Sequence, residues 1–224
     1  MELNDILAQL RAQADPAAVA GMARFGITAG ETCGVPVPQL RALAKAIGTD
    51  HALAERLWNS GIHEARILAS MIDDPRLVTE EQLERWVAAF DSWDVCDQCC
   101  GNLFDRTPFA YRKALEWSER SEEYVKRAGF ALMAYLAVHD KRASDGAFQQ
   151  FLPAIVAQAL DERNFVKKAV NWALRQIGKR NQHLNQRAIE TAGALRQIDS
   201  RAARWIAAGA LRELTSEKVQ QRLK

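Results

Sequence analysis

The stretch Phe90-Asp-Ser-Trp-Asp-Val-Cys-Asp-Gln-Cys-Cys-Gly-Asn102 is the part of this sequence from which the rest can be read. Ser92 is a typical N-cap residue, so it predicts a helix that begins at Trp93. Trp93 and Asp97 are four residues apart, which places an indole and a carboxylate side by side on one face of that helix. A large aromatic ring suits a core, whereas a carboxylate without a partner does not. This conflict between neighbours predicts a functional site.

On both sides of this stretch the sequence is typical of one helix after another. Asp15-Pro16 supplies an N-cap with proline at the first helical position, Thr79 and Gln82 form a capping box, and Gly48 is a C-cap. A Gly- and Pro-rich loop is expected over 26–38. Strand signals are nearly absent, because no alternating β-branched run and no Asn-Gly turn occurs. Besides the helices that begin at Pro16 and Trp93, the patterns predict an all-α fold with helices over 2–13, 39–47, 51–59, 62–73, 80–90, 108–117, 122–137, 147–159, 163–178, 185–197, 200–213 and 216–223.

Some of these helices resemble one another in sequence. The segments that begin at His63, Tyr124 and Phe165 can be superimposed so that Arg66, Arg127 and Lys168 coincide. The second and third segments are 41 residues apart, and residues 199–205 form a plausible fourth copy. A helical hairpin that recurs at about 40 residues is the signature of HEAT or armadillo-type stacking. We therefore predict one α-solenoid domain over 1–224, whose inner helices carry basic side chains along a concave surface.

Composition and charge narrow the class of partner. The chain is 48% hydrophobic and 26% charged, and it has no run of about eighteen apolar residues for a membrane span. We expect no secretory signal, because the acidic N-terminal residues show neither a basic nor an apolar region. The four cysteines are poorly spaced for disulfides, so a reducing cytoplasm is expected. Residues 1–111 carry 9 Lys and Arg against 16 Asp and Glu, a net charge of −7, whereas residues 112–224 carry 21 against 12, a net charge of +9. A half this basic favours a polyanionic partner.

Several blocks, in order, resemble the AlkD family of bacterial DNA glycosylases, which are HEAT-like proteins. The resemblance runs from about Met22 to Arg180. Phe25 stands where typical members have a tyrosine. The blocks are Met22-Ala-Arg-Phe25, Gly34-Val-Pro-Val-Pro-Gln-Leu-Arg-Ala-Leu-Ala-Lys45, Ser92-Trp-Asp-Val-Cys-Asp97, Tyr124-Val-Lys-Arg-Ala128 and Phe165-Val-Lys-Lys-Ala-Val-Asn-Trp-Ala-Leu-Arg175.

The resemblance implies excision of cationic N3- and N7-alkylpurines, such as 3-methyladenine and 7-methylguanine, from double-stranded DNA, without a base-shaped pocket. Asp97 is implied as the charge-stabilising carboxylate, Trp93 and Trp172 as packing against the sugar and backbone of the lesion, and Arg127 as holding a phosphate. We expect a monomer that needs no metal and no small-molecule cofactor and that associates with the nucleoid on DNA. Further DNA contacts are expected from Phe25, Arg66, Lys126, Lys168, Arg175, Lys179 and Arg180.

Other interpretations remain open from the residues alone. A non-catalytic module that binds damaged or branched DNA would use the same basic surface without needing Asp97, and a protein-binding solenoid is a third possibility. His63-Glu64 resembles half of a metal site, and Cys96-x-x-Cys99 lacks a second pair for zinc. Asp94 is expected to have a structural role at the helix N-terminus. We expect four tryptophans to lie in the core, namely Trp58, Trp86, Trp117 and Trp205.

Overall fold

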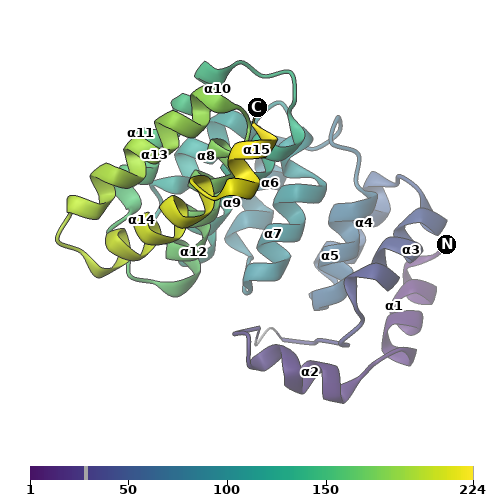
Figure 1. Cartoon of the computed structure of the whole chain (residues 1–224). Coiled ribbons are helices and arrows are strands. Elements are labelled where there is room, and N and C mark those ends of the chain that lie inside the picture. The colour runs from purple at the N-terminus through teal and green to yellow at the C-terminus, as the bar shows by residue number, and fades with distance from the viewer. Residues whose placement is uncertain (28–29, 224) are drawn as a thin grey trace. The chain divides into compact units, whose positions relative to one another are not determined.

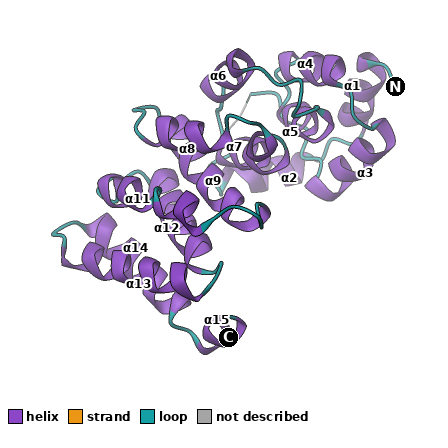
Figure 2. Cartoon of the chain, turned by 90° about the horizontal axis from the view of Figure 1, so that it is seen from above, coloured by secondary structure: helices purple, strands orange, loops and turns teal. Residues whose placement is uncertain are grey.

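The computed structural model describes residues 1–27 and 30–223, and all regular structure within these ranges is helical (Figures 1 and 2). Positions 28 and 29 of the expected loop lie outside the described residues. No helix in the described part is both long and apolar enough to cross a membrane. The elements are α1 (Leu3–Ala12), α2 (Pro16–Ala23), α3 (Val37–Ile47), α4 (His51–Asn59), α5 (His63–Ile72), α6 (Glu80–Ala88), α7 (Trp93–Asn102), the 3-10 helix η1 (Phe104–Arg106), α8 (Ala110–Ser118), α9 (Glu123–His139), α10 (Asp145–Gln149), α11 (Leu152–Gln158), α12 (Asn164–Gly178), α13 (Gln182–Gln197), α14 (Arg201–Leu214) and α15 (Glu217–Arg222).

The chain divides into two compact units, Met1–Thr107 with α1 to α7 and Pro108–Lys224 with α8 to α15. The charge asymmetry of the sequence follows this division, because residues 108–111 carry no charge. The first unit is therefore acidic and the second basic. A single superhelical domain over the whole chain stays a prediction.

The predicted helix starts are made by the expected side chains. Asp15 accepts hydrogen bonds from the backbone N–H groups of α2, Asp50 from that of Leu53 in α4, and Thr79 from that of Gln82 in α6. Gly48 ends α3 with a φ of 81°, a conformation that favours glycine. These local signals satisfy backbone groups that a helix end leaves without partners.

Two predicted boundaries are wrong. The single helix expected over 147–159 is two helices, α10 and α11, with Pro153 in the first turn of α11. The helix expected to start at 185 begins at Gln182, because the Asn181 side chain caps it by accepting from the Leu184 N–H at 2.8 Å.

Aromatic rings fill the core of the first unit. The indoles of Trp58 and Trp86 stack with their centroids 4.1 Å apart, and Phe90 and Phe104 extend the cluster. All four side chains are buried. Around this core α4 pairs with α5, while α3 and α7 pack against α5. The predicted core positions of Trp58 and Trp86 are confirmed.

The second unit is a stack of helical hairpins. α8 pairs with α9, α11 with α12 and α13 with α14, while α12 packs between α9 and α14 (Figure 1). The sequence segments at Tyr124 and Phe165 lie in the first turns of α9 and α12, so the predicted repeat is a structural one. α8 and α9 approach so closely that a Cβ on Gly129 would lie 2.5 Å from the Ser118 backbone nitrogen. Glycine is required at that contact.

The predicted burial of Trp205 is wrong, whereas that of Trp117 is confirmed. Trp117 is 1% exposed, but Trp205 on α14 is 46% exposed. The buried face of α14 is formed by Ala202, Ile206 and Ala210, and Trp205 lies next to this stripe rather than on it. Helical periodicity thus leaves its indole at the boundary with solvent.

Candidate functional site

The first turn of α7 brings together Trp93 and Phe25, two of the site residues expected from the sequence. The indole Nε1 of Trp93 donates a hydrogen bond to the backbone carbonyl of Phe25 at 3.0 Å. The Phe25 ring is 69% exposed, and Trp93 and Asp97 are half-buried. Ser92 occupies the N-cap position as predicted, although its hydroxyl caps no N–H group of the helix. The helix start therefore presents an oriented indole and, one turn later, a carboxylate.

A pair formed by a buried histidine and a half-buried aspartate supports the first turn of α7. His63, at the start of α5, has its Nε2 atom 2.8 Å from Oδ2 of Asp94. Burial alone would lower the pKa of His63, but the hydrogen bond and charge of Asp94, with the charges of Glu64 and Asp91, raise it. Burial alone would raise the pKa of Asp94, but His63 lowers it. The structural role expected for Asp94 is thus exerted through His63, which the sequence suggested only as half of a metal site.

This pair predicts a pH-dependent stability. Because folding raises the pKa of His63, the protonated imidazole stabilises the fold at pH values below the unfolded-state pKa of His63, and this contribution is lost as the pH rises through the folded-state pKa. Because folding lowers the pKa of Asp94, its carboxylate stabilises the fold at pH values above the unfolded-state pKa of Asp94, and this contribution is lost as the pH falls through the folded-state pKa. The loss of unfolding free energy caused by Asp94→Asn should therefore be larger at about pH 5.5 than at about pH 8.5. Urea unfolding at both pH values measures this difference, with the exposed Asp5→Asn as control. Equal losses at the two pH values would contradict the assigned pair.

The next residue of α5, Glu64, fixes the backbone at Cys33 and Gly34. The buried carboxylate of Glu64 accepts from the backbone N–H groups of Cys33 at 2.8 Å and Gly34 at 2.6 Å. Gly34 has a φ of 78°, and a Cβ there would lie 2.7 Å from the Asp15 carbonyl oxygen. Because His63 and Glu64 are adjacent, one helix turn secures both α7 and the segment around Cys33 and Gly34.

In the second unit, the two basic residues at the start of α9 are engaged within the protein. Arg127 is 6% exposed, and its Nη1 donates to the backbone carbonyl of Phe165 at 2.7 Å. The Lys126 ammonium group is 2.7 Å from Oε1 of Gln158 and 3.5 Å from Oδ2 of Asp161. These bonds fix the side chains against the neighbouring repeat.

Trp172 lies on α12 in a partly exposed aromatic group. Its ring meets Tyr135 edge to face, with centroids 5.0 Å apart, and Tyr135 is 5.4 Å from the His139 ring. Trp172 and Tyr135 are half-buried and His139 is exposed. The sequence identified Trp172 only through the resemblance, and it gave no signal for Tyr135 or His139.

Four of the basic residues expected to contact DNA hold the fold together. Arg175 and Lys179 both bind Glu213, with the Lys179 ammonium at 2.6 Å. Arg180 donates to the carbonyls of Ala137 and Asp140 at 2.8 Å each. In the first unit Arg66 contacts Asp91 at 3.2 Å and lies 5.2 Å from the Trp58 ring centroid. Lys168, by contrast, is exposed.

The cysteines of α7 are buried thiols that form no disulfide. Burial raises the pKa values of Cys99 and Cys100 well above the ordinary range, which makes thiolate chemistry unfavourable. Within 1–27 and 30–223, no group of three or more His, Cys, Asp or Glu side chains is placed to hold a metal ion.

Among solved structures, the chain is similar to one described as "a new family of proteins related to the HEAT-like repeat DNA glycosylases with affinity for branched DNA structures". The two share 20% identity with a TM-score of 0.78, over 100% of this chain and 96% of the other. Two designed armadillo repeat proteins, one in complex with a (KR)4 peptide, match at 15% and 16% identity with TM-scores of 0.39 and 0.37. They cover 79% and 82% of this chain and 92% and 88% of their own. The first similarity shows a HEAT-like fold.

A comparison with curated protein sequences found no match. A family profile described as "DNA alkylation repair enzyme" matches residues 6–214, which is nearly the whole chain. The match includes α7 with Trp93 and Asp97, and α9 and α12 with Arg127 and Trp172. The chain therefore belongs to the DNA alkylation repair enzyme family.

Proposed function

We propose that this protein is a DNA glycosylase that releases positively charged N3- and N7-alkylpurines from duplex DNA. The observation that carries the proposal is the half-buried carboxylate of Asp97, one helical turn from the oriented indole of Trp93. The match to a DNA alkylation repair family and the basic second unit support DNA as the substrate.

The chemistry needs few groups. An alkylated purine with a positive charge is already a good leaving group, so its departure needs little help from a general acid. As the glycosidic bond breaks, positive charge develops on the deoxyribose, and a carboxylate at a half-buried position stabilises that charge. Asp97 supplies this charge and positions the attacking water, while Trp93 packs its ring against the sugar.

The roles in the second unit rest on the resemblance. Trp172 would pack against the DNA backbone. Tyr135 meets the Trp172 ring edge to face, and the ring is half-buried, so part of it stays accessible to DNA. Arg127 would hold a phosphate. A guanidinium has five donors, so its bond to the Phe165 carbonyl sets the direction of the side chain and does not use up its hydrogen-bonding capacity.

Base release by the wild-type protein tests the proposal. Methylated duplex DNA should yield free 7-methylguanine and 3-methyladenine, whereas a duplex with a neutral adduct at one purine should yield no free base. The neutral lesion is the matched control, because its base is a poor leaving group without a general acid. Release of neither cationic base, with the DNA still bound at low salt, would contradict the proposal.

That outcome would favour a second candidate, a non-catalytic module for damaged or branched DNA. The description of the similar structure, which mentions affinity for branched DNA, is the observation behind it. Such a module would bind less tightly as salt rises, since its affinity would come from phosphate contacts. Its binding would also be unchanged by Asp97→Asn.

A further inference from the structure

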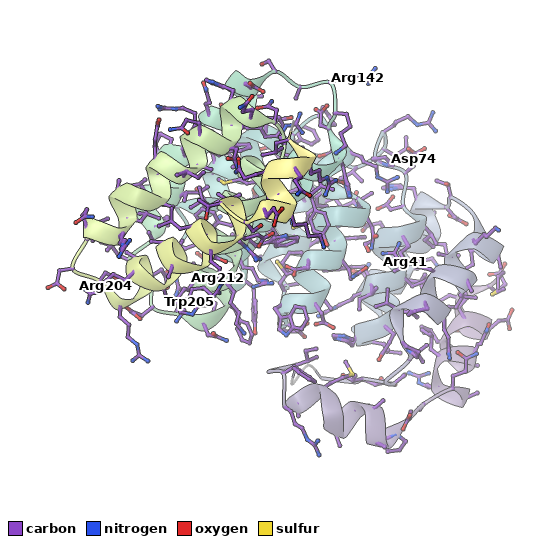
Figure 3. All side chains as sticks on the ribbon, viewed as in Figure 1. Arg41, Asp74, Arg142, Arg204, Trp205 and Arg212 are labelled. Atoms are coloured by element: carbon purple, nitrogen blue, oxygen red, sulfur yellow. The ribbon has the colours of Figure 1, made fainter. Side chains whose placement is uncertain are left out.

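Trp205 is a large aromatic side chain that the fold does not need in its core. Its indole is 46% exposed on α14, and Figure 3 shows it on the same helix as Arg204 and Arg212. Exposing so much aromatic surface forgoes the stabilisation that burial would give. The packing of α14 is already provided by Ala202, Ile206 and Ala210. The exposed ring therefore calls for an explanation beyond folding.

Positive charge surrounds this ring. Arg201 and Arg212 are exposed and lie four residues before and seven residues after Trp205, so the three share one helical face. The Lys167 ammonium group lies 5.3 Å from the ring centroid. We call Lys167, Arg201, Trp205 and Arg212 the Trp205 surface.

The neighbouring acidic groups are bound by partners outside the Trp205 surface, two of them by basic side chains and one by a backbone N–H group. Asp199 is paired with Arg204 at 2.9 Å. Glu213 is bound by Arg175 and Lys179. Glu162 accepts a hydrogen bond from the Ala202 N–H at the start of α14. The Trp205 surface therefore keeps a net positive charge.

We infer that the Trp205 surface binds an unpaired nucleotide of DNA, with the base stacked on the indole and the adjoining phosphates on Arg201 and Arg212. At 1.5 Å per residue, the two arginines lie about 6 Å and about 10 Å from Trp205 along the helix axis. Phosphates on both sides of a stacked base are thus within reach of long side chains. A base within a duplex hides its faces, so stacking selects unpaired nucleotides and tolerates any base.

A protein partner fits this surface less well. The exposed neighbour of Trp205 on the same face is Ala208, which adds little apolar area. A protein-binding patch would surround the ring with further apolar side chains, whereas guanidinium groups around an aromatic ring suit a nucleic acid strand. The inference rests on the proposed function only in taking DNA as the ligand.

Binding of two fluorescently labelled DNAs tests the inference. One is a duplex with a short single-stranded gap and the other is the same duplex fully paired. Trp205→Ala should weaken binding to the gapped DNA about tenfold and leave binding to the paired DNA nearly unchanged. Trp205→Phe should keep most of the affinity, because a phenyl ring still stacks. Arg212→Gln should weaken binding to the gapped DNA more than Arg142→Gln, which removes an equal charge from an exposed position elsewhere in the unit.

Three results would overturn the inference. They are wild-type affinity for gapped DNA in the Trp205→Ala variant, an equal loss on both DNAs, and no binding of the gapped DNA by the wild type. Base release is measured on the same preparations, so the two proposals fail separately. A variant that loses only gapped-DNA binding supports the inference even if the wild type releases no base. Normal release together with unchanged binding of gapped DNA overturns the inference and leaves the proposed glycosylase intact.

Discussion

Asp97→Asn should lower the rate of base release by at least about 100-fold while leaving the affinity for methylated DNA nearly unchanged. The substitution keeps the shape of the side chain and removes its charge. A neutral amide cannot stabilise the cation that develops on the sugar, whereas we expect ground-state binding to depend on the basic second unit. The effect should therefore fall on the chemical step.

The measurement is the single-turnover rate of 7-methylguanine release at saturating protein, with binding measured separately by anisotropy. Asp5→Asn is the matched control, because it removes one carboxylate charge from an exposed position of the same unit. It should release base at the wild-type rate. Parallel losses of rate and affinity in Asp97→Asn would instead indicate a structural role for the carboxylate.

Glu64→Ala should destabilise the first unit by about 2–4 kcal/mol, because it orphans two buried N–H groups. The carboxylate of Glu64 accepts hydrogen bonds from the N–H groups of Cys33 and Gly34. The site is buried, so solvent water does not take the place of the carboxylate as acceptor. Glu64→Gln should cost less, since its amide oxygen can still accept from one of the two N–H groups.

Urea unfolding measures this loss. The control is Glu2→Ala, whose exposed partner Arg56 is 3.9 Å away, and it should cost less than about 0.5 kcal/mol. Equal stabilities for Glu64→Ala and the control would show that the Glu64 hydrogen bonds to Cys33 and Gly34 do not stabilise the unit.

Local patterns in the sequence predicted most of the helices. Caps such as Asp50 and Thr79 act within one turn, so their effect can be read from neighbouring residues. The prediction over 147–159 was wrong because the break at Gln150 and Phe151 carries no glycine and the only proline follows it. Repeat spacing identified α9 and α12 because the similar segments at Tyr124 and Phe165 lie in the first turns of these two helices.

The contacts of individual side chains were much less predictable. His63 and Asp94 are 31 residues apart, and only the packing of α5 against α7 makes them partners. Likewise, nothing in the sequence around Arg175 indicates that Glu213, 38 residues later, binds it. A basic residue looks the same in the sequence whether it contacts DNA or a neighbouring helix, so the charge pattern could not indicate these internal contacts, and the DNA contacts expected from the same residues stay predictions.

The most direct test of the role of Asp97 compares two abasic-site analogues in otherwise identical duplexes. One carries a cationic pyrrolidine in place of the deoxyribose, which mimics the charge that develops on the sugar, and the other carries an uncharged tetrahydrofuran. The wild type should bind the cationic analogue at least about tenfold more tightly, and Asp97→Asn should lose that preference. Equal binding of both analogues by the wild type, or a preference that persists in Asp97→Asn, would contradict the assignment of Asp97 as the charge-stabilising carboxylate.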